Sequence, residues 1–514
     1  MKSYPGIDTR TGWWIAILLF LGTVSCGSQP SPGEELRVLI EADPAHLDPR
    51  LGSDQASLRI HQLLYNGLVT IDEFGLPAPD LAESWEREDD RTYLFHLRPG
   101  LRFHDGRPVT ARDVAYTIES IREGEVASFR KGDFEQLEAV QVVDPRTIRF
   151  RLRQPFSPFL TVLTVGIIPE NRSGEIAVES VGTGPYRLVE YRRDDRLVLA
   201  ANSDYFRGVP AIPRVQFRIV PDQTSRLLEL RKGSADLVYG DLFPDQIGWL
   251  QKDSRYRVIT GQSWKYDYIG FNLEDPILGN PLVRKAIAHG IDRESIRTHL
   301  LQGYARLATG MLQADHWAYE SQVNRYDHDI RRAAELLDQA GFPDPDGAGP
   351  EPRFRVTYKT SNSEFARRKA AVFQEQLRRI GIQMEIRTYE WATFYEDIRA
   401  GRFQLFSLTW TGVVDPDIYR FRFHSRMIPP DGANRGRYRN PEIDGLLEEG
   451  LRETDRARRT EIYSRVQKIL ATDVAEISLW HRDEIAVLKA ELVGFRLTPM
   501  GDYRVIAELR WERK

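Results

Sequence analysis

The stretch SLTWTGVVDPDIY, residues 407–419, holds residue types that could carry chemistry. An apolar run ends at Trp410, the chain turns at Gly412, and Asp415 and Asp417 stand on either side of a proline. Two carboxylates this close could form an acid–base pair or help to hold a metal ion. A large aromatic residue beside polar groups is also typical of a ligand pocket, and an aspartate before proline can simply cap a turn. The residues alone leave these alternatives open.

Other short motifs give weaker signals. His96 and His104 lie on opposite sides of a Pro-Gly turn, so we do not expect them to converge on one metal ion. The glycines of residues 180–191 lack the lysine of a phosphate-binding loop and precede a strand pattern rather than a helix. Asp415 and Asp417 have no second carboxylate cluster near them in the sequence. We therefore expect no metal, no cofactor and no catalysis.

The bulk composition is that of a soluble globular protein of more than one domain. The chain has 514 residues, of which 41% are hydrophobic and 28% are charged. A chain of this length exceeds one ordinary core, so two or three domains are expected. The net charge is −4 without a basic block, which gives no reason to expect a nucleic-acid partner.

The N-terminal region carries a targeting pattern. A positively charged start is followed by an apolar run at residues 13–21, too short to span a bilayer, and then by small residues before Cys26. The pattern resembles a bacterial lipoprotein signal, which implies a signal peptide at 1–25 and a diacylglycerol group on Cys26. Residues 26–34 would form a lipidated tether that holds a periplasmic or otherwise extracytoplasmic body at a membrane. An ordinary signal peptide with a chance cysteine is the alternative.

The first half of the chain alternates apolar and polar residues over short segments. This pattern predicts strands separated by Gly, Pro and Asp turns. A helix is expected over 109–121, where Thr110 and Asp113 have nearly the spacing of a capping box. Many strands with few helices indicate an α+β lobe with a mixed or antiparallel sheet. The expected strands are 36–40, 92–97, 147–152, 186–191, 196–201 and 214–220.

The second half alternates strands with helices. Strands are expected at 353–358, 382–388 and 403–410, and helices at 332–342, 366–380 and 391–401. Crossovers of this length make neighbouring strands parallel, so the pattern predicts a doubly wound α/β lobe over residues of about 270 to 480. Ligands bind beyond the carboxyl ends of such strands, and Trp410 ends one of them.

Several segments, in order along the chain, resemble the solute-binding proteins of peptide- and nickel-type ABC importers. The longest are LRVLIEADPAHLDPRLGSDQASLRIHQLLYNGLVTIDEFGLPAPDLAESWE, YLFHLRPGLRFHDGRPVTARDVAYTIESI and YDYIGFNLEDPILGNPLVRKAIAHGIDRESI. VGTGPYRLVEY, AAELLDQAGF and YSRVQKILATDVAEISLWH add to the series. Together they span nearly the whole chain after the tether.

The resemblance implies an α/β, two-lobed fold of the type II periplasmic-binding-protein kind. One α+β lobe would comprise 35–265 and 485–514, with an extra subdomain at about 60–180. The other would be a doubly wound α/β lobe at 270–480. The hinge would lie near 266–270 and 480–485.

The resemblance also implies a function. The protein would be a monomeric receptor that closes on peptides or peptide-like solutes and delivers them to ABC permease subunits. In peptide-binding relatives a tryptophan, two small residues and an aspartate grip the α-ammonium group of the ligand. Trp410, Thr411 and Gly412 match this motif, but Val413 replaces the aspartate.

Because Val413 departs from this motif, the chemical class of the cargo stays undecided. Asp415 could reach in from two residues later, or the ligand could lack a free amino group there. Trp264, Tyr266 and Tyr268 lie at the predicted crossing and could also face the ligand, although packing is the alternative for each. A non-peptide cargo, such as a chelated metal, an opine or an oligosaccharide, and a signalling lipoprotein on the same fold remain alternatives.

Overall fold

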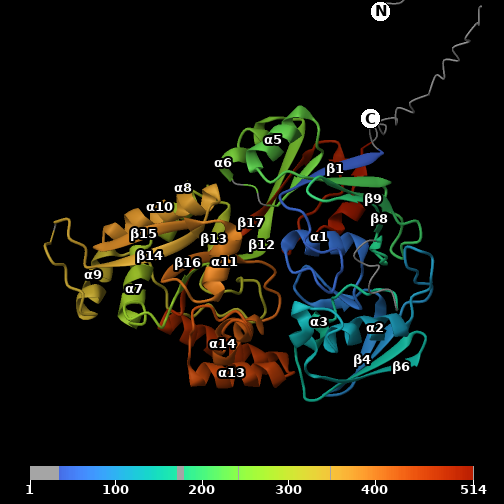
Figure 1. Cartoon of the computed structure of the whole chain (residues 1–514), viewed down its shortest axis with the longest axis horizontal. Helices are drawn as coiled ribbons and strands as arrows, with labels where there is room; N and C mark the ends of the chain where they lie inside the picture. Colours follow the sequence, from blue (N-terminus) through green and yellow to red (C-terminus); the bar gives the residue numbers. More distant parts are fainter. Residues whose placement is uncertain (1–33, 171–178, 241, 243, 348, 513–514) are drawn as a thin grey trace, which may run out of the picture.

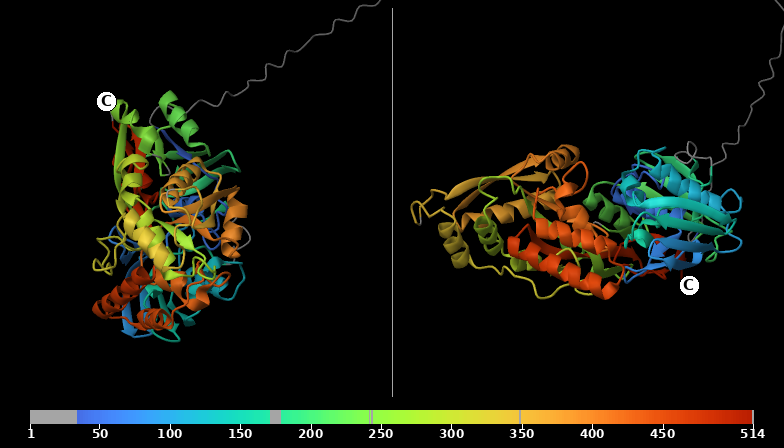
Figure 2. Two further views of the ribbon diagram at one scale, coloured as in Figure 1. Left: turned by 90° about the vertical axis from the view of Figure 1, so that its left-hand side faces the viewer. Right: turned by 90° about the horizontal axis from the view of Figure 1, so that it is seen from below.

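The computed structural model describes residues 34–170, 179–240, 242, 244–347 and 349–512. Two lobes lie side by side, and the long strands β12 (Tyr256–Phe271) and β17 (Glu476–Lys489) run between them (Figure 1). Figure 2 shows the elongated body that results, with the two lobes at its opposite ends. The predicted signal peptide, Cys26 and nearly all of the tether lie outside the described residues.

One mixed sheet extends through both lobes. Its strand order is β15-β14-β16-β12-β17-β11-β1-β10-β9-β8, and β13 pairs with β17 beside this path. Its other strands are β1 (Glu35–Ile40), β8 (Tyr186–Arg192), β9 (Arg196–Ala201), β10 (Arg214–Ile219), β11 (Leu237–Tyr239), β13 (Ala305–Leu307), β14 (Phe354–Ser361), β15 (Ile382–Tyr389) and β16 (Leu405–Trp410).

In the first lobe, β1 lies between two parallel partners, β10 and β11, whereas β9 and β8 continue the sheet in antiparallel order. Leu36, Val38 and Ile40 of β1 face a core that includes α1 (Gln55–Leu64). Leu39 faces the other core, which includes α5 (Gln223–Lys232). Because both faces are covered at this end of the strand, buried apolar residues lie on both of its sides.

An antiparallel sheet of four strands forms the extra subdomain of this lobe. Its order is β4-β5-β7-β6, and α2 (Ala111–Arg122) packs on it through Val114 and Ile118. The helix begins at the expected capping residues, where the backbone N–H of Thr110 donates to the Asp113 carboxylate at 2.8 Å. The strands are β4 (Ala82–Asp89), β5 (Thr92–Leu97), β6 (Leu137–Asp144) and β7 (Thr147–Leu152), and a separate hairpin pairs β2 (Val69–Ile71) with β3 (Pro77–Pro79).

The second lobe is doubly wound. β14 is parallel to both β15 and β16, and the crossover helices α10 (Glu364–Arg378) and α11 (Trp391–Arg399) belong to different core clusters. Helices α7 (Pro281–Gly290), α8 (Arg293–His299) and α9 (Ile330–Gln339) share the core of α10, while α12 (Ile418–Phe423), α13 (Pro441–Arg452) and α14 (Arg456–Asp473) share that of α11. The predicted fold class is confirmed.

The remaining elements are short. They are α3 (Phe159–Val162), α6 (Pro244–Ile247), the 3₁₀ turns at Phe129–Phe134, Leu250–Lys252, Ser425–Met427 and Arg504–Glu508, and the pair β18 (Leu492–Val493) and β19 (Arg510–Trp511).

The two crossing strands change neighbours at one place. Residues 486–488 of β17 pair with β11 of the first lobe, and residues 480–482 pair with β13 of the second. Opposite this change, β12 is interrupted by a register shift between Gln262 and Lys265. A bulge bends a strand and loosens its ladder, so the sheet is locally irregular where it passes between lobes.

Candidate functional site

The loop that follows β16 faces the first lobe. Gly75, in the turn between β2 and β3, has a positive φ of 78°, and a Cβ there would lie 3.6 Å from the Val414 carbonyl oxygen. The same position lies 3.7 Å from the indole ring of Trp264. This turn of the first lobe therefore meets the loop of the second lobe, with Trp264 of β12 beside it.

Trp410 ends β16 at the carboxyl edge of the parallel strands. It pairs with Tyr266 of β12, and its indole lies edge-on to Phe421, with ring centres 6.3 Å apart. The guanidinium carbon of Arg435 lies 5.2 Å from the indole centre. The indole nitrogen is buried without a hydrogen-bond partner among the described residues. A buried donor without an acceptor costs about 1–3 kcal/mol, so Trp410 is a candidate for contact with a ligand.

The next three residues differ in exposure. Thr411 and Gly412 are exposed, and Gly412 has a φ of 69°, which glycine adopts without strain. Val413 is 6% exposed and packs in the core shared by α11 to α14. The position that carries an aspartate in the resembling proteins therefore points its side chain into this core.

Asp415 is committed to partners within its own lobe. Its carboxylate accepts from Nη2 of Arg459 at 2.9 Å and from Nη1 at 3.3 Å. It also accepts from the backbone N–H of Asp417 at 2.8 Å, which is the turn-capping contact. Asp415 thus makes the contact of the turn-cap alternative, together with an ion pair to a residue 44 positions downstream, and its role toward a ligand stays a prediction.

Asp417 begins α12 with one carboxylate oxygen buried and without a hydrogen-bond partner among the described residues. Burial raises the pKa of Asp417 to about 7, and the charge of Arg420 opposes the rise. The carboxyl group is thus poised near neutral pH, but Asp415 beside it is held by Arg459. The two aspartates do not form a pair of free carboxylates.

The three aromatic residues of β12 that were predicted to face the ligand separate into two environments. Tyr266 and Tyr268 are 0% exposed, stack with ring centres 5.8 Å apart, and pack in the α11–α14 core. The hydroxyl of Tyr266 donates to Glu476 at 2.7 Å. Trp264 is 8% exposed and lies beside the turn at Gly75, which also meets the Val414 carbonyl. The structure therefore brings Trp264 and the Trp410 loop to the lobe boundary and places the two tyrosines beneath it.

Hydrogen bonds and an ion pair also join the lobes elsewhere. The backbone N–H of Ser157 donates to the Leu451 carbonyl at 2.9 Å, and Leu451 packs in the subdomain core. α13 and α14 accordingly lie beside α3 (Figure 1). On the side of α6, Asp245 pairs with Arg368 of α10 at 2.7 Å.

A group of buried charges occupies the crossing. Glu484 accepts from Arg59 of α1 at 2.9 Å and pairs with Lys265 at 2.8 Å. On the second-lobe side, Asp267 pairs with Arg482 at 2.7 Å. Lys369 of α10 donates to the Ser407 hydroxyl at 2.8 Å, and burial lowers the pKa of Lys369 to about 8.

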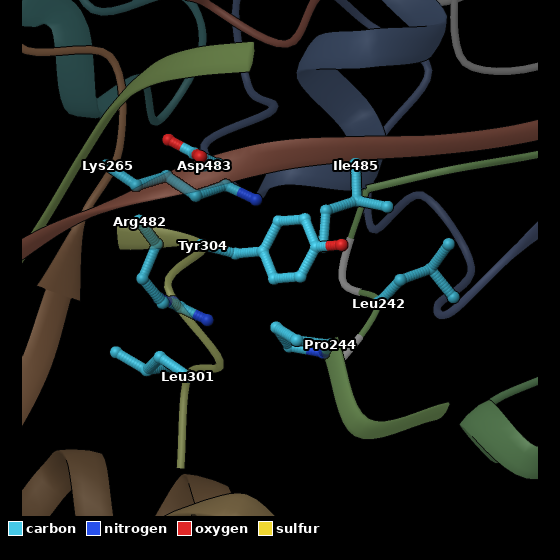
Figure 3. Close-up of a pocket in the computed structure, with 8 residues that line it drawn as sticks. All are labelled: Leu242, Pro244, Lys265, Leu301, Tyr304, Arg482, Asp483 and Ile485. Carbon is cyan, nitrogen blue, oxygen red and sulfur yellow. The ribbon is translucent and has the colours of Figure 1, made fainter. Parts of the chain in front are cut away.

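A small pocket opens beside these charges. Figure 3 shows Tyr304 in the middle of it, with Lys265 and Arg482 from the crossing strands and Leu242 and Pro244 from the first lobe around it. The pocket has room for about one water molecule. It is too small for a peptide, so it is not a candidate cargo site in this conformation.

Sequence analysis did not predict Arg435, Glu484 or Lys369. Their partners lie tens to hundreds of residues away, and no local motif marks them. Among the described residues there is no group of three or more His, Cys, Asp or Glu side chains arranged to hold a metal ion. Within the same residues no helix is both long enough and apolar enough to cross a bilayer.

Comparisons with known proteins agree with this architecture. Residues 77–426 match the family model described as bacterial extracellular solute-binding proteins, family 5 middle. The oligopeptide-binding protein AppA of Bacillus subtilis is 26% identical over 497 residues, which cover 92% of this chain and 91% of AppA. Heme-binding protein A of Haemophilus influenzae is 28% identical over 479 residues, covering 86% of this chain and 85% of that protein.

Solved structures show the same fold. AppA in complex with a nonapeptide superposes with a TM-score of 0.82, at 26% identity, over 93% of this chain and 99% of that one. NikZ from Campylobacter jejuni, solved with Ni(L-His), has a TM-score of 0.83 at 24% identity and covers 93% of this chain and 100% of its own.

Proposed function

The chain belongs to the bacterial extracellular solute-binding proteins of family 5, and we propose that it is the receptor of an ABC importer that binds peptides or peptide-like solutes between its lobes. The observation that carries the proposal is the family match over 77–426 on a body whose two lobes meet at the Trp410 loop. The family is one of binding proteins, and the proposed role involves no catalysis.

The proposed mechanism is closure of two lobes around a solute. The lobes would be 35–265 with 485–514, and 270–480, flexing near 266–270 and 480–485. The register shift after Gln262 and the change of strand partners between residues 482 and 486 support a bend at the start of this region. A solute that contacts both lobes favours the closed form by its differential affinity, and the closed form would then dock on the permease subunits.

The proposed cargo contacts are Trp410, Thr411, Gly412 and Trp264. Trp410 has an unpaired indole N–H, Thr411 and Gly412 are exposed, and Trp264 lies at the boundary between lobes. We leave Tyr266 and Tyr268 out of this set because both are fully buried. Asp415 is also left out as a ligand for an ammonium group, because Arg459 already holds it.

The receptor would work as a monomer outside the cytoplasmic membrane, on a lipid attached to Cys26 after removal of residues 1–25. The pattern of a short apolar run, small residues and a single cysteine supports this proposal. A polar tether at 26–34 would leave the lobes free to move.

Isothermal titration with short peptides tests the proposed cargo. We expect di- to pentapeptides to bind, and we expect acetylation of the amino end to change affinity by less than about threefold, because Val413 offers no carboxylate and Asp415 is engaged. A non-peptide cargo is the second candidate, favoured by Val413 and by the heme-binding relative. Native mass spectrometry of retained solutes separates the two, and retention of a non-peptide solute without peptide binding would replace the first candidate by the second.

A further inference from the structure

Arg435 is a buried cation in the loop between α12 and α13. The residue is 9% exposed, and its Nη2 donates to the Tyr395 hydroxyl at 3.0 Å. Its guanidinium carbon lies 5.5 Å from the Tyr395 ring centre and 5.2 Å from that of Trp410. Its Nε is buried without a hydrogen-bond partner, and no carboxylate of the described part of the chain forms an ion pair with it. Burying a guanidinium is costly unless an opposite charge accompanies it.

A neighbouring arginine shows the contrast. Arg422 lies 4.2 Å above the Tyr268 ring centre and pairs with Glu476 at 2.5 Å. Nη1 of Arg435 approaches the hydroxyl of the same tyrosine at 3.4 Å. The single carboxylate of this cluster, Glu476, is already taken by Arg422 and by the Tyr266 hydroxyl. Of the two guanidinium groups beside Tyr268, only that of Arg422 therefore has a carboxylate partner, and the charge of Arg435 is uncompensated among the described residues.

The second observation is the unpaired indole nitrogen of Trp410. Trp410 and Arg435 stack on each other, so two unpaired N–H donors, the indole and Nε of Arg435, belong to one cluster. The cluster lies directly beneath exposed aromatic surface. Trp391 is 53% exposed and stacks on Tyr395 at 5.7 Å, and Phe421 is 41% exposed and packs on Trp410. An oxyanion at this edge could accept from both donors and balance the charge.

We propose that Arg435, Trp410 and Tyr395 form a subsite for a carboxylate group of the cargo. The proposal rests on the proposed function and names the class of cargo as one that presents an acid, rather than an ammonium group, to the loop after β16. The surroundings agree, because Val413 points into the core and Asp415 is neutralised by Arg459. The faces of Tyr395 and Trp410 attract the guanidinium and allow it to stay buried when no anion is bound.

The test uses N-acetylated alanine peptides of two to five residues, each as the free carboxylate and as the carboxyl-terminal amide. Isothermal titration compares wild type, Arg435→Gln and Arg439→Gln. Arg439 is the matched control, because it lies in the same loop but its side chain is 61% exposed. Its Nη2 makes a loose ion pair with Oε1 of Glu274, at 3.9 Å. We expect wild type to prefer the acid by roughly 10- to 100-fold, the magnitude of a hydrogen-bonded charge, and only Arg435→Gln to lose this preference.

Each outcome decides the proposal. Equal binding of acid and amide by wild type, or an acid preference that survives in Arg435→Gln, overturns the carboxylate subsite and leaves the peptide receptor intact. Binding of free-amine peptides without binding of the acetylated acids overturns the carboxylate subsite alone, and binding of neither free-amine nor acetylated peptides overturns both proposals. If Arg435→Gln does not fold, Arg435→Lys decides instead, because lysine keeps the charge but not the planar donors. A reduced preference of Arg435→Lys for the acid, with unchanged affinity for the amide, supports the subsite. An unchanged preference for the acid overturns it.

Discussion

Replacing Glu484 by glutamine tests whether the buried charges at the crossing stabilise the fold. The Glu484 side chain is 0% exposed and pairs with Arg59 and Lys265, whose side chains are 4% and 9% exposed. Glutamine keeps the shape but removes the charge, and leaves two cations in a site that water hardly reaches. Removing one partner of such a network costs about 3–5 kcal/mol. Because 1 kcal/mol shifts the Tm of a unit of 150–250 residues by about 2–4 °C, we expect a drop of roughly 6–20 °C.

Thermal unfolding followed by circular dichroism at pH 7 measures this change, with Glu508→Gln as the control. Glu508 pairs with Arg496 at 3.0 Å, but the two side chains are 48% and 55% exposed. An exposed pair contributes about 0–1 kcal/mol, so the control should lose at most a few degrees. Combining Glu484→Gln with Lys265→Met removes one of the stranded cations and should restore part of the loss. Equal Tm values for Glu484→Gln and Glu508→Gln would refute the reasoning.

Three further predictions concern the loop after β16 and the N-terminus. Asp415→Asn removes the charge that holds Arg459, so the free energy of unfolding, measured in urea, should fall by about 1–3 kcal/mol. The affinity for peptides should not change. A variant with normal stability that no longer binds peptides with a free amino end would contradict the turn-cap role. Burial raises the pKa of Asp417 to about 7, so the folded state holds this proton more tightly than the unfolded state does, and the contribution of the group to stability falls as pH rises from about 4 to 7. The Tm of Asp417→Asn should therefore rise relative to that of wild type as the pH is raised from 5 to 8. A Tm difference between the two proteins that does not change with pH would argue against the buried carboxyl group. Cys26→Ala should move the protein from the membrane fraction to the soluble fraction of cells; an unchanged distribution on immunoblots would exclude the lipid anchor.

The regular elements could be predicted because their signals are local. The alternation in LRVLI, TYLFHL and RLVLAA corresponds to β1, β5 and β9, and the stripe of α10 follows from apolar residues three and four apart. The crossover lengths also predicted the parallel strands of the second lobe. Sequence did not indicate that a single sheet passes through both lobes, because strand order depends on pairing between segments more than 200 residues apart, such as β12 with β17.

The site was harder to predict because its residues meet only in three dimensions. Alternation places Trp264, Tyr266 and Tyr268 on one side of a strand, but only the packing of α11 to α14 decides which rings are covered. The turn-capping contact of Asp415 is local and was one of the alternatives, whereas its partner Arg459 is not marked in the sequence. Arg435 looks like an ordinary loop arginine until Tyr395 and Trp410 are placed around it.

Closure of the lobes should depend on cargo, because the ion pair that joins them on the side of α6 is exposed to solvent. Asp245 and Arg368 have side chains that are 29% and 44% exposed, and such a pair contributes about 0–1 kcal/mol. Shifting a population from 1:99 to 99:1 requires about 5.5 kcal/mol of differential affinity, which such contacts do not supply. A carboxylate bound to Arg435 gains more binding free energy when the closed lobes exclude water, since charges attract more strongly at low dielectric. The same acid group would then both select the cargo and favour the closed form, so Arg435→Gln should weaken closure as well as binding, measurable as a larger radius of gyration by X-ray scattering with acid peptide present.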